Sequence, residues 1–475
     1  MSVKKKDSPL AAKSADRSPV AARDAAYRVL MMVEEQNAYA NLALKKLFSQ
    51  IKISAADKRL ATHIVYGSVR QRFSLDYIIN HLLSDPHAPL MTQARVILRL
   101  SIYQLYYLDR IEPYSVVDEA VKLAKRYANL PISRLVNAVL RNYLRRCEAL
   151  GGKEKMLPDK SDIFGYLHIT LSYPRWLVER WLSEFGAEAA VRLALWGNSN
   201  PGLWLRTNTL KLRREELQAA LERSGINCSS GGYSYETLRV DGDGGALLRS
   251  PAFSGGGCIV QGVASQLVAH ALSPESGSRV LDMCAAPGGK TTHLAALMNN
   301  KGELHAFDIH EHKIKLIEEN ARNLGIDIIK AACCDATSLP GSYHNWADYV
   351  LLDAPCSGLG VLNVRPDSRY HKKSRDVADM AALSAALLDA AADYVRPGGL
   401  LCYSTCTITH EENGDNIRRF LSEHENFAPE PMQKLAVMLH REEDKQDALA
   451  GRIQLLPHIH GTEGFFIALL RKKHE

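Results

Sequence analysis

The fold is decided by the stretch Val280-Leu281-Asp282-Met283-Cys284-Ala285-Ala286-Pro287-Gly288-Gly289-Lys290-Thr291, in which a short apolar run leads into a loop of small residues and then a helix. Small side chains let a ligand approach the backbone, and the first turn of a helix offers unpaired N–H groups. The loop lacks the GxGxxG order of dinucleotide binders, and Lys290 does not have phosphate-loop spacing. The stretch therefore predicts a loop for an anionic or zwitterionic ligand other than a nicotinamide dinucleotide or a nucleoside triphosphate.

The same order of strand, loop and helix repeats along the rest of the carboxyl half. Apolar runs occur at 303–307, 327–330, 349–352 and 400–404, and helical spacing occurs at 312–323 and 378–395. This alternation predicts a mainly parallel sheet covered by helices. We expect a last apolar run, 465–470, to pair antiparallel at the far side of the sheet.

Two aspartates follow the next strands at the edge where parallel sheets bind ligands. Asp308 lies 19 residues after Gly289 and could accept hydrogen bonds from both ribose hydroxyls of an adenosine. Asp335 ends the third strand at an equivalent depth.

The amino half has a different pattern. Residues 1–17 are polar and predict a flexible tail. Apolar spacing of three or four from 18 to 152 predicts an all-helical domain, and 153–250 predicts a small α+β connector before a catalytic domain at 251–475.

The basic residues are concentrated at one end. Residues 1–155 hold 26 Lys and Arg against 14 Asp and Glu, a net +12, so the remainder carries −6 of the total +6. Such asymmetry is typical of contact with a polyanion, although a solvated helical surface explains the charge equally well.

Nine cysteines without paired CxxC spacing indicate reduced thiols rather than a zinc site or a disulfide scaffold. No run reaches the roughly 18 apolar residues of a membrane helix, and no secretory signal is evident, so we expect a cytoplasmic protein. His310 and His312 are expected to be surface histidines, and no metal site is predicted.

Two cysteines stand apart from the others because each follows a predicted strand end. Cys356 lies in Asp353-Ala354-Pro355-Cys356-Ser357, and Cys406 lies in Ser404-Thr405-Cys406. Both thiols are therefore expected at one mouth of the sheet, where a thiolate could act as a nucleophile. A disulfide or two inert core thiols is the alternative.

Methylation of carbon 5 of cytosine is chemistry that such thiols could perform. Carbon 5 is a poor nucleophile until a thiolate adds to carbon 6. The resulting enamine attacks a sulfonium methyl group, a base then removes the carbon 5 proton, and the thiol is eliminated. A protonated carboxyl group near N3 would favour the addition, and Asp353 is placed for that role.

The segments 282–290, 353–357 and 404–406 together resemble the signature of the RNA cytosine-C5 methyltransferase family, the Nol1/Nop2/Sun group. The resemblance implies a Rossmann-like class I domain that uses S-adenosylmethionine (SAM), with Cys406 as the nucleophile and Cys356 assisting release. It also implies catalytic roles for Asp353 and Lys290. The related DNA enzymes use the Pro-Cys cysteine, so the second cysteine favours the RNA class. The implied SAM contacts are Cys284, Ala285, Ala286, Pro287, Gly288, Gly289, Lys290, Asp308, Asp335 and Asp353.

The helical region resembles NusB-type RNA-binding domains at 57–60, 65–70 and 136–141, and 204–208 resembles a connector found before such catalytic domains. This combination is similar to the bacterial branch of the family. It implies a monomer acting on 16S ribosomal RNA, at cytosine 967, or on a small-subunit assembly intermediate. Methylation of another RNA such as transfer RNA, and a non-enzymatic RNA-binding assembly factor, remain the alternatives.

Two further features bear on the site. Gly262 stands in Val260-Gln261-Gly262 where relatives usually have an aspartate, which removes a carboxylate. Arg365, Asp367, Arg369, Lys372 and Lys373 are expected to line the rim of the cytosine pocket, where the basic groups would meet RNA phosphates; a solvated loop is the alternative.

Overall fold

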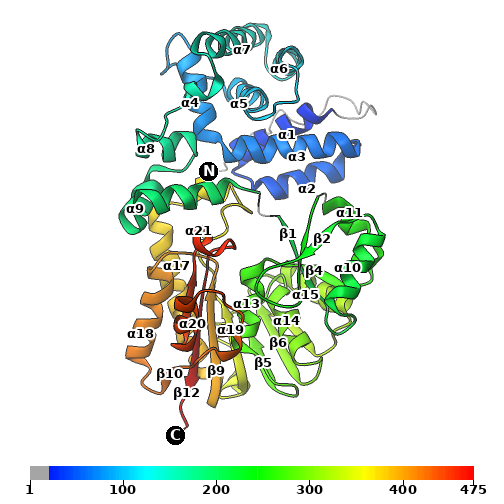
Figure 1. Cartoon of the computed structure of the whole chain (residues 1–475), viewed down its shortest axis with the longest axis vertical. Coiled ribbons are helices and arrows are strands. Elements are labelled where there is room, and N and C mark those ends of the chain that lie inside the picture. The colour runs from blue at the N-terminus through cyan, green and yellow to red at the C-terminus, as the bar shows by residue number, and fades with distance from the viewer. Residues whose placement is uncertain (1–20, 201, 243, 475) are drawn as a thin grey trace, which may run out of the picture. The chain divides into compact units, whose positions relative to one another are not determined.

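The structure is a computed structural model that describes residues 21–200, 202–242 and 244–474, so the predicted tail lies outside the described residues. The chain forms two compact units, which divide between Glu179 and Arg180 (Figure 1). In the described part of the chain, no helix has both the length and the apolar character that a membrane span requires.

The first unit is helical, as predicted, and no strand occurs among its described residues. Ala25, Ala26 and Val29 are fully buried on one face of its first helix, which follows the expected spacing of three and four. The unit contains α1 (Ala22–Gln36), α2 (Ala40–Gln50), α3 (Ala55–Arg70), α4 (Arg72–Leu82), α5 (Thr92–Tyr107), α6 (Pro113–Tyr127), α7 (Leu130–Leu150), η1 (Lys153–Met156), α8 (Ile163–Gly165) and η2 (Tyr166–Thr170).

The helix α9 (Arg175–Asn198) begins in the first unit and ends in the second. It is broken at Gly186, whose φ of 75° lies in the left-handed region that favours glycine. The predicted amphipathic helix around residues 176–185 is thus the first part of a longer, kinked element.

The connector is an antiparallel sheet of order β2-β3-β1-β4. Leu205, Leu217 and Leu238 are fully buried in its core. The fourth strand lies beyond residue 250, where we expected the connector to end. The elements are β1 (Leu203–Thr207), α10 (Arg214–Arg223), β2 (Cys228–Ser230), β3 (Thr237–Val240), α11 (Gly244–Arg249), α12 (Pro251–Ser254) and β4 (Cys258–Val260).

The carboxyl-terminal part of the chain contains the predicted sheet, in the order β10-β12-β9-β8-β5-β6-β7, with β11 paired to β12. The strands from β9 to β7 are parallel, and β12 is antiparallel to β9, as the sequence predicted. The strands are β5 (Arg279–Asp282), β6 (Glu303–Asp308), β7 (Ile329–Cys333), β8 (Ala347–Asp353), β9 (Val395–Thr405), β10 (Phe427–Pro429), β11 (Arg452–Leu455) and β12 (Phe465–Lys472).

Helices cover both faces of this sheet. Val280 of β5 packs into a core with α13 (Val263–Leu272), α14 (Gly289–Leu297) and α15 (Glu311–Leu324). Its neighbour Leu281 packs on the other face against α17 (Ser374–Tyr394) and α18 (Asn416–Glu423), because successive strand residues point to opposite faces. The remaining elements are η3 (Gly341–Tyr343), α16 (Ser368–His371), η4 (Glu411–Asp415), α19 (Gln433–Ala436), α20 (Glu442–Leu449) and α21 (Pro457–His460).

In the sheet, β6 lies on one side of β5, and β8, which comes later in the chain, lies on the other side. A reversal of this kind opens a crevice at the carboxyl ends of the two central strands. The predicted ligand loop follows β5, and the Asp353 motif ends β8, so the sheet order brings both to this crevice.

Candidate active site

The crevice holds a small, open pocket with a cavity volume of about 190 Å³. It brings together most of the residues predicted to contact the cofactor. It also includes the start of α13, where the sequence indicated Gly262 but not Ser265. The lining residues are Val260, Gln261, Gly262, Ser265, Asp282, Cys284, Ala285, Ala286, Pro287, Gly289, Lys290 and Asp353.

The loop after β5 is shaped by Gly288. Its φ of 97° is accessible to glycine, and a Cβ there would lie 3.2 Å from the Ile317 backbone of α15. The loop is tied down by the Ala285 amide, which donates to Phe307, and by the Asn320 side chain, which donates to the Pro287 carbonyl. Gly288 itself does not line the pocket, and its predicted contact with the cofactor stays a prediction.

Asp282 is a pocket residue that we did not predict as a ligand contact. It is 1% exposed, and burial raises its pKa to about 7 even though Thr291 donates a 2.7 Å hydrogen bond to one carboxyl oxygen. The other oxygen, Oδ1, is buried without a hydrogen-bond partner among the described residues. A ligand that brings a positively charged donor, as the amino group of SAM does, fits this carboxyl group.

Asp308 and Asp335 lie outside the pocket lining. Asp308 is buried at the end of β6 and accepts from its own turn, at the His310 amide. Asp335 is exposed two residues beyond β7, and hydrogen bonds from the Thr337 amide and hydroxyl lower its pKa. Contact of either carboxylate with the cofactor stays a prediction.

The two predicted cysteines meet, with their sulfur atoms 3.3 Å apart and both thiols free. The hydrogen bond from Cys356 lowers the pKa of Cys406, and the cations Lys290 and Arg365 act in the same direction. The same hydrogen bond and burial raise the pKa of Cys356 well above its usual value. The pair therefore favours one thiolate, on Cys406, and one thiol, on Cys356.

Asp353 is held from both sides beside the cysteines. Lys290 Nζ lies 2.6 Å from one carboxylate oxygen, and the Ser404 hydroxyl donates to the other at 2.8 Å. Burial opposes the charge on Lys290, but Asp353 raises the pKa of this lysine, which also lies 5.0 Å over the Phe465 ring. The geometry places a carboxylate and a proton donor together at the mouth of the pocket.

Glu412, which the sequence did not single out, holds the loop that carries Cys356. Its buried carboxylate accepts from the Ser357 amide and hydroxyl, each at 2.6 Å, and from the Thr409 hydroxyl at 2.5 Å. The feature that distinguishes Glu412 is a carboxylate surrounded by several hydrogen-bond donors. Those donors lie on separate segments of the chain, so the sequence alone does not bring them together.

The predicted basic rim is partly wrong. Arg369 is fully buried and donates to Asn198 and to the Gly197 carbonyl, and Asp367 is 4% exposed. These two residues therefore serve packing rather than RNA contact. Arg365 and Lys373 are exposed.

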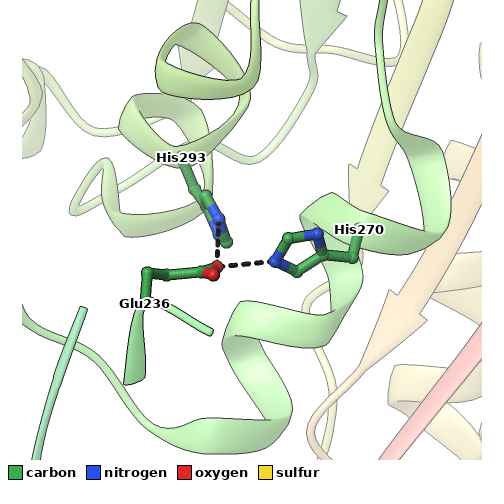
Figure 2. A group of neighbouring side chains, drawn as sticks. All are labelled: Glu236, His270 and His293. Carbon is green, nitrogen blue, oxygen red and sulfur yellow. Dashed lines mark hydrogen bonds and ion pairs between the residues drawn. The ribbon is translucent and has the colours of Figure 1, made fainter. Parts of the chain in front are cut away.

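A second cluster of ionisable groups lies where the connector packs on α13 and α14. Glu236 Oε1 accepts from His270 Nε2 at 2.6 Å and from His293 Nε2 at 2.9 Å (Figure 2). Among the described residues these three form the group with metal-ligating chemistry, their ligand atoms lying within 4.8 Å of one another. His310 and His312 are exposed and belong to no such group in the described chain.

The charges of this cluster have partners within the protein. Arg206 is 2% exposed, burial lowers its pKa to about 9, and Glu236 acts in the opposite direction as its charge partner. Burial and the Arg206 charge lower the pKa of His293 to about 3, so its ring is neutral and donates to Glu236. A divalent cation would add positive charge beside a buried guanidinium.

Arg206 connects this cluster to the cofactor loop. Its guanidinium donates to the Gly289 carbonyl at 2.6 Å, to the Thr292 hydroxyl at 3.0 Å and to the side chain of Gln261. The connector sheet thereby orients the first turn of α14 and one wall of the pocket.

A sheet of this order, with a pocket after its first parallel strand and two thiols beside it, defines a SAM-dependent methyltransferase. Comparison with protein families gives the same class. The family described as 16S rRNA methyltransferase RsmB/F matches residues 269–471, the NusB family matches 20–145, and the ferredoxin-like domain of RsmF/B-like methyltransferases matches 173–245.

Relatives span nearly the whole chain. The probable ribosomal RNA small subunit methyltransferase B of Bacillus subtilis is 37% identical over 95% of this chain and 98% of its own length. The ribosomal RNA small subunit methyltransferase B of Klebsiella pneumoniae is 31% identical over 89% and 92%. The chain belongs to the RsmB branch of the 16S rRNA methyltransferase RsmB/F family.

Solved structures agree with this assignment. The crystal structure of PH0851 has a TM-score of 0.76 and 28% identity over 96% of this chain and all of the other. NSun6 from Pyrococcus horikoshii, solved with SFG, has a TM-score of 0.57 and 26% identity over 64% of this chain and 99% of its own. The predicted fold class, enzyme class and SAM dependence are confirmed.

Proposed function

We propose that this enzyme methylates carbon 5 of a cytosine in 16S ribosomal RNA, cytosine 967, through a covalent bond between Cys406 and carbon 6 of the ring. The observation that carries the proposal is the pair of sulfur atoms 3.3 Å apart beside the Asp353–Lys290 ion pair. One thiolate, one thiol and one carboxylate within a single mouth match the groups that the reaction requires.

The pocket residues would hold the cofactor. Asp282 offers a buried carboxyl oxygen for the amino group, and residues 284–290 offer backbone and small side chains. Bound SAM supplies an electrophilic methyl group. Asp308 and Asp335 are proposed as further contacts from the ends of the next strands.

The reaction begins at Cys406. Its thiolate, favoured by the thiol of Cys356 and by Lys290 and Arg365, forms a bond to carbon 6. The Lys290 ammonium donates to Asp353 at 2.6 Å, and a proton shared by this pair makes a hydrogen bond to N3 that limits the negative charge on the ring. Carbon 5 then has the electron density that it needs to accept a methyl group.

Cys356 acts in release. Two causes of its high pKa are the hydrogen bond to Cys406 and the Cys406 charge, and both disappear once Cys406 is bonded to carbon. Cys356 can then lose its proton to solvent and take the proton from carbon 5. The electrons of that C–H bond restore the ring and expel Cys406 as a thiolate, which returns the pair to its starting state.

The helical unit is proposed to bind neighbouring RNA. Its match to the NusB family and the net +12 of residues 1–155 support this role. The proposed substrate is 16S RNA, free or in an assembling small subunit. The enzyme is also proposed to act in the cytoplasm, as a monomer and without a metal ion.

The test uses two cysteine variants with labelled SAM and 16S RNA. Cys406→Ala should abolish methyl transfer, and Cys356→Ala should accumulate a protein–RNA adduct that migrates slowly on a denaturing gel. Cys402→Ala, in a buried strand position, is the matched control and should do neither. Residual transfer by Cys406→Ala would refute the assignment, and methylation away from cytosine 967 would redirect it to another RNA site.

A further inference from the structure

The start of α13 lacks a side-chain cap of its own. Gly262 occupies the N-cap position with extended backbone (φ −64°, ψ 154°), and it makes no side-chain cap hydrogen bond. The first N–H groups of a helix need acceptors, which Asp, Asn, Ser or Thr at this position normally supply. Because glycine has no side chain, an acceptor for these N–H groups must come from another part of the chain.

Glu463, in the turn between β11 and β12, meets it. Its Oε2 accepts a 3.1 Å hydrogen bond from the Ala264 amide, the donor that an N-cap side chain would satisfy. A Cβ built on Gly262 would lie 1.9 Å from Glu463 Oε1, so the carboxylate fills the volume of the missing side chain. The Thr462 hydroxyl donates to the same Oε2 at 2.7 Å and fixes its position.

The capped turn is a wall of the cofactor pocket. Gln261, Gly262 and Ser265 all line it, and Gln261 donates to the Ser265 hydroxyl at 3.2 Å. Loss of the Glu463 contact would therefore loosen one wall of the pocket while the loop after β5 remains intact.

The same turn also contacts the backbone that carries the nucleophile. The Gly464 amide donates to the Gly360 carbonyl at 2.8 Å, and the Gly360 amide donates to the Cys406 carbonyl at 3.0 Å. A Cβ on Gly360 would lie 2.0 Å from the Gly464 carbonyl oxygen, so the two backbone segments approach too closely for any side chain at residue 360. These bonds hold the Glu463 turn in a fixed place relative to the cysteines.

We propose that Glu463 is a positioning residue that caps α13 in place of a side chain at residue 262 and thereby shapes the SAM pocket. This role rests on the proposed function in one respect, namely that the pocket is the SAM site. Glu463, near the carboxyl end of the chain, thus supplies the carboxylate that residue 262 lacks.

The test measures SAM affinity of the full-length enzyme without RNA, by isothermal titration, in four variants. Glu463→Ala should weaken binding about fivefold, the change expected for loss of one capping hydrogen bond. Glu463→Gln keeps an acceptor oxygen and should lose less. Gly262→Asp combined with Glu463→Ala should restore affinity to within about twofold of the wild type, because the new carboxylate occupies the vacated volume.

Glu430→Ala is the matched control. Glu430 also lies beside β12, where it pairs with Arg471 at 2.6 Å, but it does not touch the pocket. Its loss should leave SAM affinity unchanged. In methylation assays Glu463→Ala should raise the KM for SAM with little change in kcat, whereas a general folding defect would lower kcat and leave KM alone.

The outcomes separate this role from the proposed function. Unchanged affinity in Glu463→Ala, or no recovery in the double variant, would overturn the capping role while leaving methylation intact. A wild-type enzyme that binds SAM with the predicted variant pattern but spares cytosine 967 would overturn the proposed RNA target alone. Failure of the wild type to bind SAM would overturn both.

Discussion

Replacing Glu236 by Gln should destabilise the second unit strongly while changing almost no volume. The carboxylate is the charge partner of the buried Arg206 guanidinium and the acceptor for His270 and His293 (Figure 2). A glutamine keeps one acceptor oxygen but removes the charge. Arg206 would then be a buried cation whose charge no longer has this partner.

The exposed fractions of the side chains set the expected size. They are 8% for Glu236, 10% for His270 and 3% for His293, so little solvent is available to replace the lost charge. Removal of one partner from a buried pair costs about 3–5 kcal/mol. We expect the low end, about 3 kcal/mol, because the glutamine oxygen can still accept from one histidine.

The assay is urea and thermal unfolding of the full-length protein, with Glu215→Gln as the control. Glu215 accepts from Tyr235 and pairs with Arg214 on the exposed surface of the connector, and its replacement should leave the unfolding midpoint unchanged. Adding Arg206→Met to Glu236→Gln should recover part of the loss, because the unpartnered charge is removed as well.

Two results would refute this explanation. One is a Glu236→Gln protein as stable as the wild type. The other is stoichiometric zinc in the purified wild type, measured by mass spectrometry, together with a lower unfolding midpoint after chelation. The second result would mean that Glu236, His270 and His293 bind a metal ion.

Other charges in the site give three further predictions. Arg365→Ala removes a cation that lowers the pKa of Cys406, so the pH–rate profile should move to higher pH; an unmoved profile would contradict this influence. For Asp282, burial raises the folded-state pKa from 3.8 to about 7, so its contribution to stability is complete below about pH 4 and is lost as pH rises through 7. Relative to Asp282→Asn, the wild type should lose up to about 4 kcal/mol of stability between pH 4 and 7, and a constant difference in urea unfolding would refute the shift. Glu412→Gln weakens three hydrogen bonds that hold the Cys356 loop, so single-turnover methyl transfer should slow at least about tenfold; a wild-type rate would show that the loop needs no such support.

The fold was predictable where apolar spacing repeats. The strands after residues 280, 303 and 349 were expected within a few residues of their observed bounds, because buried strands in a parallel sheet are short apolar runs. The third strand begins at Ile329 rather than 327 and ends at Cys333, which leaves Asp335 in an exposed turn. Strand ends depend on pairing partners, which sequence spacing does not specify.

The meeting of Cys356, Cys406 and Asp353 at one mouth of the sheet was predictable because each lies at or just beyond a strand end, although their catalytic roles stay a proposal. It was not predictable where distant segments meet. Glu412 became visible only once its donors were assembled by tertiary packing. Arg369 shows the converse error, because a basic residue near a site looks the same in sequence whether it faces RNA or a buried carbonyl.

The turn before β12 has a consequence for the enzyme during its own synthesis. Ribosomes build chains from the amino end, so β12 is made after every other strand of its sheet. Until then, β9 lacks a neighbouring strand on one side, and the N-terminus of α13 lacks the Glu463 carboxylate that caps it. The backbone at Cys406 also lacks the hydrogen bond that joins Gly360 to Gly464. An unfinished chain thus holds the two thiols of the site without a completed pocket, and competence for methyl transfer should arise only when the last strand inserts.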